Sequence, residues 1–342
     1  MKRYGNLYPL MYDLDNIRLA HKNAKRGKAH YKEVQMINSN IDTYVNAIHY
    51  MLKDKTFRNA EYTIFIKNDN GKLREIYKLP YYPDRIVHHC IMQILEPIWM
   101  SVFITDTYSS LKGRGIHRGV KRLQKALQDI ENTTYCLKLD IRKFYPSIDR
   151  SILKSIIRKK IKDSDVLWLL DVLIDSTSGI PIGNYLSQYF GNLYLAYFDH
   201  WMKEGMQCKY YFRYCDDIII LHKDKEVLHN LLVDIDAYLY ANLKLVIKHN
   251  YRIFPVDACG IDFLGYVFYH THTLARKAIV KRFKKKIAYV LRNYKCIKAF
   301  AITSSIMSYT GWFIHCNSKN LIKSYITKRV KFIMCGGRNG YK

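Results

Sequence analysis

Apolar residues recur three or four positions apart in several parts of the chain, which is the spacing of one face of an α-helix. This pattern predicts helices over residues 14–56, 84–99 and 151–175. A further helix is expected after Gly115, with four apolar residues on its buried face: Val120, Leu123, Leu127 and Ile130.

Other segments show the two-residue period of strands. Residues 61–76 predict a hairpin, because Asn68–Gly71 supply turn residues between two apolar runs. Its less exposed face is expected to hold Tyr62, Ile64 and Ile66. Residues 135–139 predict a strand that ends at Asp140. Residues 210–221 predict a second hairpin with three residues at its tip: Cys215, Asp216 and Asp217.

Charge is distributed unevenly. The chain has 56 Lys and Arg against 29 Asp and Glu, a formal net charge of +27. No acidic residue follows Asp262, whereas residues 263–342 contain 17 Lys or Arg. Apolar residues recur at every fourth position there, with basic residues between them: Ile279, Phe283, Ile287 and Leu291. This predicts a helix with a basic face. A solvated face is one explanation, but a long stretch without acids repels itself, so we expect phosphate-backbone binding.

Composition narrows the class of protein. Hydrophobic residues make up 49% of the 342 positions, which is typical of a folded chain. A chain of this length can form a larger hydrophobic core than a small binding module needs, and this favours an enzyme. The eight cysteines show no CxxC or zinc-like spacing, so we expect reduced thiols. No apolar run approaches the roughly 20 residues of a membrane span. We expect a soluble intracellular protein without a membrane partner.

Carboxylates at the ends of apolar strands suggest the chemistry. Asp140 ends one predicted strand, and Asp216 and Asp217 lie between two others. A hydrated turn would explain the adjacent pair by itself. Three carboxylates at one sheet edge, however, are the ligands that Mg²⁺ prefers. Two such ions can activate a hydroxyl and stabilise a leaving phosphate oxygen, so the pattern predicts nucleotidyl transfer.

Ordered sequence blocks resemble those of the reverse transcriptases. They are the hairpin with Lys72 and Arg74, LPYYPDRIVHH, TYSSLKGRGIHRGV, LKLDIRKFYPSID, GIPIGNYLSQYFGNLYLAYFD, FRYCDDIII, LKLVIKHN and GIDFLGY. A YxDD motif alone is weak, whereas the whole ordered series is specific. The resemblance implies an α+β right-hand polymerase with fingers, a palm with an antiparallel sheet, and a helical thumb. The implied bounds are fingers 1–113, palm 114–150, fingers insertion 151–178, palm 179–272 and basic thumb 273–342.

The resemblance, carried over position by position, implies a two-metal site. Asp140 and Asp216 would hold two Mg²⁺ ions, with Mn²⁺ as a possible substitute. The carbonyl of Ile141 would be a further ligand, and Asp217 would assist less directly. Lys248 matches the lysine proposed as general acid to the pyrophosphate leaving group. A simple phosphate contact is the equal alternative for Lys248.

The same resemblance implies contacts with the incoming dNTP. Lys72 and Arg74 match finger residues that clamp the triphosphate. Tyr145 matches the aromatic gate that excludes a 2′-hydroxyl, with core packing as the alternative. Ile182 and Gly183 would lie beside the nucleotide.

Two further groups would hold the nucleic acid. A hairpin would grip the primer end through Gly260, Phe263, Leu264, Gly265 and Tyr266. The thumb would bind the duplex through basic residues: Arg276, Lys277, Lys281, Arg282, Lys284, Lys285 and Lys286.

The block GIPIGNYLSQ narrows the resemblance. Most reverse transcriptases have Gln at the position of Ile182 and Pro at that of Gln188. The fidelity motif here consists of Ile182, Gly183, Asn184, Ser187 and Gln188. It resembles reverse transcriptases of diversity-generating retroelements, which misincorporate opposite template adenines and retrohome into a variable region. Ile can only pack where Gln hydrogen-bonds, so Ile182 would loosen base-pair control, unless the change is neutral packing.

This narrower family implies several partners: a template-repeat RNA, the cDNA/RNA duplex, dNTPs and an oligomeric basic accessory variability protein. It also implies a bacterial or phage-encoded protein in the cytoplasm. A retron, defence-associated or group II intron-like reverse transcriptase is the alternative. A catalytically silent RNA-binding protein on the same fold is a further alternative, disfavoured by the three intact aspartates.

Overall fold

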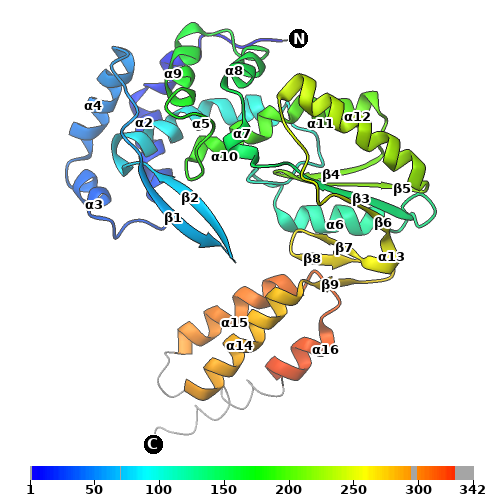
Figure 1. The fold of residues 1–342 in the computed structure, drawn as a ribbon. Helices are drawn as coiled ribbons and strands as arrows, with labels where there is room; N and C mark the ends of the chain where they lie inside the picture. The colour runs from blue at the N-terminus through cyan, green and yellow to red at the C-terminus, as the bar shows by residue number, and fades with distance from the viewer. Residues whose placement is uncertain (1, 70, 294–298, 328–342) are drawn as a thin grey trace, which may run out of the picture. The chain divides into compact units, whose positions relative to one another are not determined.

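The computed structural model describes residues 2–69, 71–293 and 299–327 (Figure 1). The chain divides into two compact units. The first unit comprises Met1–Leu111, Asp140–Lys209 and Val233–His249. The second unit comprises Lys112–Leu139, Tyr210–Leu232 and Asn250–Lys342. The fingers, palm and thumb bounds implied by the resemblance remain a prediction.

Helices form the N-terminal part of the first unit: α1 (Tyr8–Met11), α2 (Leu14–Ala24), α3 (Lys32–Ser39), α4 (Ile41–Lys53) and α5 (Ile86–Met100). Helix α2 begins at a strong cap, because the Asp13 side chain accepts hydrogen bonds from the backbone amides of Asp15 and Asn16. Its apolar face packs against α4 and α5. The helices predicted over 14–56 and 84–99 are confirmed.

The predicted hairpin is present as β1 (Thr63–Asp69) and β2 (Lys72–Lys78). The Asn68 side chain accepts a hydrogen bond from the Gly71 amide at 2.8 Å, which stabilises the turn. The expected burial on β1 is wrong, because Ile64 is 54% and Ile66 66% exposed. The two-residue alternation of apolar residues reflects the pleat of this strand and does not identify a buried face.

The helices predicted over 151–175 are confirmed as α8 (Arg150–Arg158) and α9 (Ser164–Ile174). The first unit also contains α7 (Phe144–Ser147), α10 (Tyr185–Tyr194) and α11 (Ala196–His200). π-helical turns at Tyr81–Arg85 and Trp201–Gly205 precede α5 and follow α11. Helix α10 packs against α5 and α8, and most of its residues are buried.

A four-stranded sheet lies in the second unit, in the order β4-β5-β3-β6. Its strands are β3 (Tyr135–Asp140), β4 (Tyr210–Tyr214), β5 (Asp217–His222) and β6 (Arg252–Pro255). The pairs β4–β5 and β3–β6 are antiparallel. Helix α12 (Lys225–Leu243) follows β5, and its last part belongs to the first unit.

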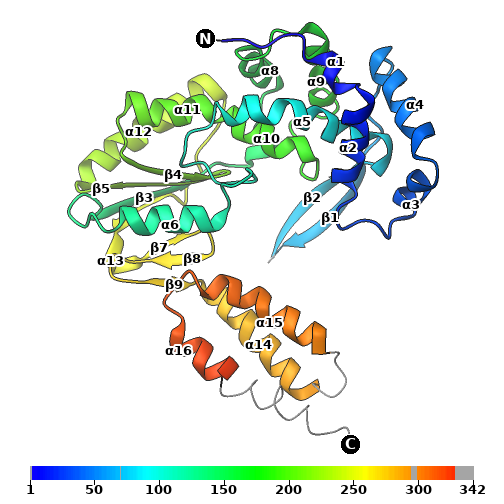
Figure 2. The same cartoon turned by 180° about the vertical axis from the view of Figure 1, so that it is seen from behind.

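Helix α6 (Ile116–Ala126) lies along this sheet in both opposite views (Figures 1 and 2). Val120, Leu123 and Leu127 are buried, as predicted. Ile130 is 57% exposed, so its predicted burial is wrong. The helix ends before Ile130, and helical periodicity no longer determines which way that side chain points.

The C-terminal part of the second unit contains a three-stranded sheet and a helical pair. The sheet consists of β7 (Ile261–Phe263), β8 (Tyr266–Phe268) and β9 (Thr273–Ala275), preceded by α13 (Val256–Cys259). The helices are α14 (Lys277–Asn293), α15 (Ala299–Phe313) and α16 (Lys319–Ile322), followed by a π-helical turn at Lys323–Thr327. Their core contains Ile279, Phe283, Ile287, Val290, Ile306 and Phe313, with Leu291 packed against it.

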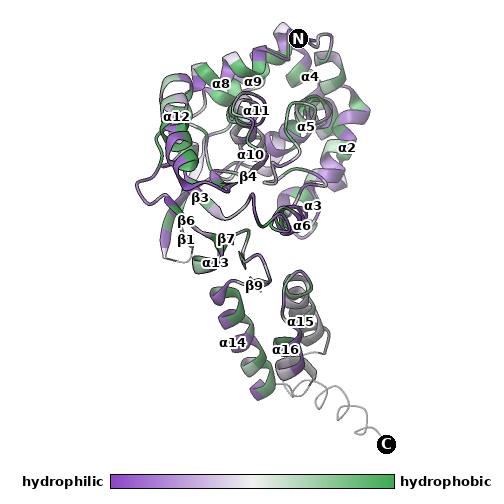
Figure 3. Cartoon of the chain, turned by 90° about the vertical axis from the view of Figure 1, so that its right-hand side faces the viewer, coloured by the Kyte–Doolittle hydropathy of each residue, from purple (hydrophilic) through white to green (hydrophobic). Residues whose placement is uncertain are grey.

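Figure 3 shows hydrophilic and hydrophobic residues interleaved along α14. The predicted amphipathic helix with a basic face is therefore confirmed.

The described cysteines are free thiols, as predicted: Cys90, Cys136, Cys208, Cys215, Cys259 and Cys316. In the part of the chain that the structure describes, every helix is too short or too polar to cross a membrane.

Candidate active site

Asp140, the last residue of β3, forms an ion pair with Lys248. The Lys248 Nζ lies 2.5 Å from Asp140 Oδ2. The backbone fixes this pair, because the Lys248 amide donates to the Asp140 carbonyl at 2.8 Å and Ile141 pairs with Ile247 as an antiparallel bridge. The two residues that sequence reasoning placed in one site are therefore neighbours within the first unit.

The second carboxylate oxygen of Asp140 is buried and has no hydrogen-bond partner among the residues that the structure describes. A buried carboxylate oxygen without a partner is costly, because it has lost its hydration without replacement. A hard cation such as Mg²⁺ takes this kind of oxygen as a ligand. The surroundings of Asp140 thus fit a metal ligand.

The turn between β4 and β5 presents Asp216. Tyr214 pairs with Asp217, so Cys215 and Asp216 form a two-residue connection, and Cys215 has the positive φ of +57° that such turns require. Arg213 is fully buried, and its guanidinium donates to the Cys215 carbonyl at 2.9 Å. Arg213 therefore stabilises the turn that carries the acids. Sequence reasoning missed it, although a cation inside an apolar strand was a visible signal.

Lys138 balances the charge of Asp217. Its Nζ lies 3.6 Å from Asp217 Oδ1 and also donates to the backbone carbonyl of Asp262. All three residues belong to the second unit. Sequence reasoning missed Lys138 as well, because a strand pattern does not reveal which residue lies opposite a polar position.

Across the described ranges, no three His, Cys, Asp or Glu side chains are grouped as a metal site. Metal coordination by the aspartates remains a prediction.

The fidelity motif is attached to the first hairpin. The Tyr77 amide of β2 donates to the Ile182 carbonyl at 2.8 Å. Gly183 has φ +127°, and a Cβ added there would lie 2.4 Å from the Tyr77 carbonyl oxygen. Only glycine permits this approach of the two backbones. The chain thus fixes the base of the hairpin against the loop that precedes α10.

The other motif residues have distinct surroundings. The Asn184 amide donates to the Tyr62 hydroxyl at 2.8 Å, which is a second link to the hairpin. Ser187 is buried and Gln188 is exposed on α10. Lys72 and Arg74 are exposed on β2.

Tyr145 is half-buried in α7 and packs on α10. A Cβ added to Gly191 would lie 3.1 Å from the Tyr145 ring, so the two helices approach closely there. This contact accounts for core packing, and the gating role of Tyr145 remains a prediction.

The segment predicted to grip the primer is a tight hairpin. Phe263 pairs with Tyr266, and the two turn residues, Leu264 and Gly265, have φ values of +53° and +88°. Positive φ at both positions is the type I′ geometry of two-residue hairpins. Gly260, at φ +71°, precedes β7. Because Phe263, Leu264 and Tyr266 are buried, any primer contact here falls to the backbone of the turn.

The predicted thumb residues lie at the start and along the exposed face of α14. Lys277, Lys281, Arg282, Lys284 and Lys285 are exposed, and Lys286 is half-buried. Arg276, just before the helix, pairs with Asp262 through an Nη2–Oδ1 distance of 2.5 Å. The last acidic residue of the chain is therefore neutralised within the second unit, and the face of α14 keeps its positive charge.

Comparison with known proteins agrees with this geometry. The family described as reverse transcriptase (RNA-dependent DNA polymerase) matches residues 66–268. Protein YkfC of Escherichia coli (strain K12) is 24% identical over 259 residues, which cover 63% of this chain and 66% of that protein. The group II intron-encoded protein LtrA of Lactococcus lactis subsp. cremoris is 24% identical over 160 residues, covering 43% of this chain and 26% of that protein. The chain thus spans only part of the length of each relative.

Solved structures show the same fold. Apo telomerase from Candida tropicalis has a TM-score of 0.54 at 10% identity, covering 90% of this chain and 65% of that one. Telomerase from the same organism with a fragment of telomeric RNA has a TM-score of 0.53 at 11% identity, covering 90% and 59%. The predicted α+β right-hand polymerase fold is confirmed. Since the family match covers more than half of the sequence, the chain belongs to the reverse transcriptase (RNA-dependent DNA polymerase) family.

Proposed function

We propose that this chain is an RNA-directed DNA polymerase that extends a primer with dNTPs by two-metal nucleotidyl transfer. The observation that supports this most strongly is the family match over residues 66–268, because that range contains the three aspartates and Lys248. The strand order adds support, since β3, which ends at Asp140, is the neighbour of β5, which begins at Asp217.

In this proposal Asp140 and Asp216 hold two Mg²⁺ ions, with the Ile141 carbonyl as a further ligand and Asp217 assisting. The ions would activate the primer hydroxyl and stabilise the leaving phosphate oxygen. The buried, unpartnered oxygen of Asp140 supports its part in this role.

The chain's own cations would act on the triphosphate. Lys72 and Arg74, exposed on β2, would bind phosphate oxygens, and Arg can do so through two parallel hydrogen bonds. Lys248, held beside Asp140, would donate a proton to the leaving pyrophosphate. Tyr145 would exclude a 2′-hydroxyl from the sugar position, and the basic face of α14 would bind the product duplex.

The finer proposal is a reverse transcriptase of a diversity-generating retroelement. The motif from Ile182 to Gln188 supports it. Such an enzyme would copy a template-repeat RNA with errors opposite adenine and would work with an oligomeric basic accessory protein in a bacterial cytoplasm. The alignment with LtrA, a group II intron-encoded protein, favours the second candidate, a group II intron-like reverse transcriptase.

Primer extension tests the proposed activity. An RNA template with a DNA primer, Mg²⁺ and dNTPs is supplied to the full chain, to Asp216→Asn and to Asp236→Asn. Asp236 is an exposed acid on α12 and serves as the matched control. We expect extension by wild type and by the control, and none by Asp216→Asn. Equal extension by all three would overturn the metal assignment. Template binding without any extension would favour a binding protein on this fold.

A further inference from the structure

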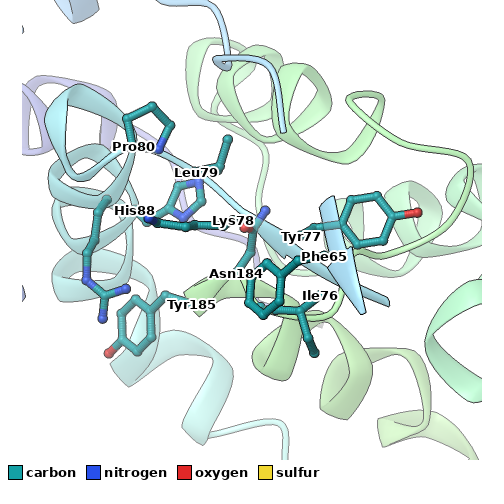
Figure 4. A pocket seen from close by; sticks show the side chains of 11 residues that line it. Phe65, Ile76, Tyr77, Lys78, Leu79, Pro80, His88, Asn184 and Tyr185 are labelled. Atoms are coloured by element: carbon teal, nitrogen blue, oxygen red, sulfur yellow. The ribbon is translucent and has the colours of Figure 1, made fainter. Parts of the chain in front are cut away.

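The pocket beside the β1–β2 hairpin is lined by Tyr77, Gly183 and Asn184, so it belongs to the motif described above (Figure 4). Lys138, in the second unit, is a different case. It contacts Asp217, one of the three aspartates, but has no part in the proposed chemistry. The contacts of Lys138 therefore need an explanation of their own.

The alternation of β3 directs the Lys138 side chain away from the apolar core. Leu137 and Leu139 on either side are buried, and successive side chains of a strand point to opposite faces of a sheet. The Lys138 Nζ lies 3.6 Å from Asp217 Oδ1, and the two side chains are 28% and 30% exposed. Ion pairs with this much exposure contribute little to stability. The pair is therefore better explained by the orientation it imposes than by the stability it provides.

The same ammonium group also binds strand β7. It donates a hydrogen bond to the backbone carbonyl of Asp262, and β7 is an edge strand of its sheet. An ammonium group has three N–H donors, so it can serve two acceptors at once. Lys138 thus links the first residue of β5, in the four-stranded sheet, to β7, in the three-stranded sheet.

Asp262 is itself held in place. Its Oδ1 accepts a hydrogen bond from Arg276 Nε at 2.7 Å, and the Arg276 amide donates to the Gly265 carbonyl at 2.9 Å. Asp262 is thus bound through its backbone by Lys138 and through its side chain by Arg276. The acceptor that Lys138 uses on β7 therefore has a fixed position within the second unit.

We propose that Lys138 is a positioning residue for nucleotide addition. By holding Asp217 against β7, Lys138 keeps the neighbouring Asp216 in one orientation. Reacting groups must be held closely in place, since a misplacement of about 1 Å can lower a rate about 100-fold. The reaction named here rests on the proposed function, whereas the link between β5 and β7 is a property of the second unit by itself.

Single-turnover nucleotide addition by the full chain tests this role. The rate is measured at saturating Mg²⁺ and primer–template for wild type, Lys138→Met and Lys138→Arg. We expect Lys138→Met to lower the rate about 10- to 100-fold with an unchanged KM for dNTP, because a positioning residue touches no nucleotide. Lys138→Arg keeps the positive charge and N–H donors, so it should recover most of this loss. An unchanged rate in Lys138→Met, or equal losses in both variants, would overturn the proposal.

Arg252→Met is the matched control. Arg252 lies opposite Lys138 on β6. Its guanidinium contacts the Cys259 sulfur at 3.8 Å and the Phe254 ring at 5.3 Å. This variant removes a neighbouring positive charge and leaves the link to Asp217 intact, so we expect an unchanged rate. A loss equal to that of Lys138→Met would assign the effect to local charge and overturn the proposal.

A direct contact between Lys138 and nucleic acid would give a different result. The Kd for primer–template is measured without Mg²⁺ or dNTPs, and we expect the same value for wild type and Lys138→Met. A higher Kd combined with an unchanged rate at saturation would make Lys138 a phosphate contact and overturn the proposal.

Hydrogen exchange of the free chain tests the link without any activity. Asp217 pairs with Tyr214 at one end of the link, and the Arg276 amide donates to the Gly265 carbonyl at the other. We expect Lys138→Met to reduce protection in the peptides that contain Asp217 and Arg276, and Arg252→Met to leave both unchanged. Full protection of both peptides in Lys138→Met would overturn the link. Reduced protection, with no primer extension by wild type, would support the link and overturn the polymerase.

Discussion

Lys248 and Asp140 form a two-point contact, in which the Lys248 backbone amide binds the Asp140 carbonyl and its ammonium binds the Asp140 carboxylate. This contact keeps the Lys248 ammonium 2.5 Å from Oδ2 of Asp140, whose charge it neutralises. In the proposed function Lys248 would also meet a phosphate of the nucleotide. The two roles proposed for Lys248 make different kinetic predictions.

Lys248→Met is expected to lower the single-turnover rate of nucleotide addition by about 100-fold or more, which is the contribution of a general acid. Lys248→Arg should not rescue this rate, because arginine does not release its proton. Lys223→Met, at an exposed lysine of the second unit, is the control. A higher KM for dNTP with an unchanged rate would show instead that Lys248 only contacts phosphate.

Gly183→Ala is expected to separate the hairpin from the loop before α10. The substitution places a Cβ 2.4 Å from the Tyr77 carbonyl at a φ of +127°, so the folded chain must move one of the two backbones. Strain of this kind costs about 1–3 kcal/mol. The free energy of unfolding, measured in urea, should therefore fall, and primer extension should be impaired. Gly115→Ala has open space around its Cβ and should leave both measurements unchanged.

Ile182→Gln is expected to lower the error rate opposite template adenines, because the glutamine side chain can hydrogen-bond near the incoming nucleotide. The measurement is sequencing of cDNA made from a defined RNA template by wild type, Ile182→Gln and Ile66→Gln, the last at an exposed hairpin position. An adenine error rate unaffected by Ile182→Gln would refute the role of this residue in fidelity.

Phe283→Ala is expected to destabilise the α14–α15 core by about 3–5 kcal/mol, because the phenyl ring is fully buried and its loss leaves a cavity. Tyr289→Ala lies on the same helix at a position that is 55% exposed. It should change the free energy of unfolding by less than about 0.5 kcal/mol. Thermal or urea unfolding distinguishes them, and similar losses for both would contradict the amphipathic assignment of α14.

Asp149 is expected to make stability depend on acid pH. Its hydrogen bond with Lys244, followed by that from the Ile152 amide, holds the pKa of Asp149 below its usual range. A lowered pKa stabilises the fold above the ordinary value of about 3.9, and this contribution is lost as the pH falls through the lowered value. Asp149→Asn should therefore reduce stability at neutral pH and flatten the acid limb of the unfolding profile. Asp236→Asn, at an exposed acid, should reproduce the wild-type profile.

Local pattern was enough to predict most elements and the location of the acids, because both depend on neighbouring residues. The strand ending at Asp140 and the turn carrying Asp216 follow from short apolar runs that stop at acids. The sequence pattern failed where contacts with residues distant in the chain decide whether a side chain is buried. Ile64 and Ile66 alternate as expected of a strand, but both are exposed among the residues that the structure describes.

The same limit explains the residues that were missed. Lys138 and Arg213 gain their importance from Asp217, Asp262 and the Cys215 carbonyl, and strand periodicity does not identify those partners.

The hairpin around Gly265 has a mechanical consequence. The Arg276 amide donates to the Gly265 carbonyl, the Arg276 guanidinium binds Asp262, and the Tyr266 hydroxyl donates to the Trp312 carbonyl. The residue before α14 is thus fastened to β7 and to the turn after it at two points, and α15 is fastened to β8 at a third. A force applied to the lysines of α14 would therefore be transmitted directly to the turn between β7 and β8. A duplex bound to that helix would pull on this hairpin.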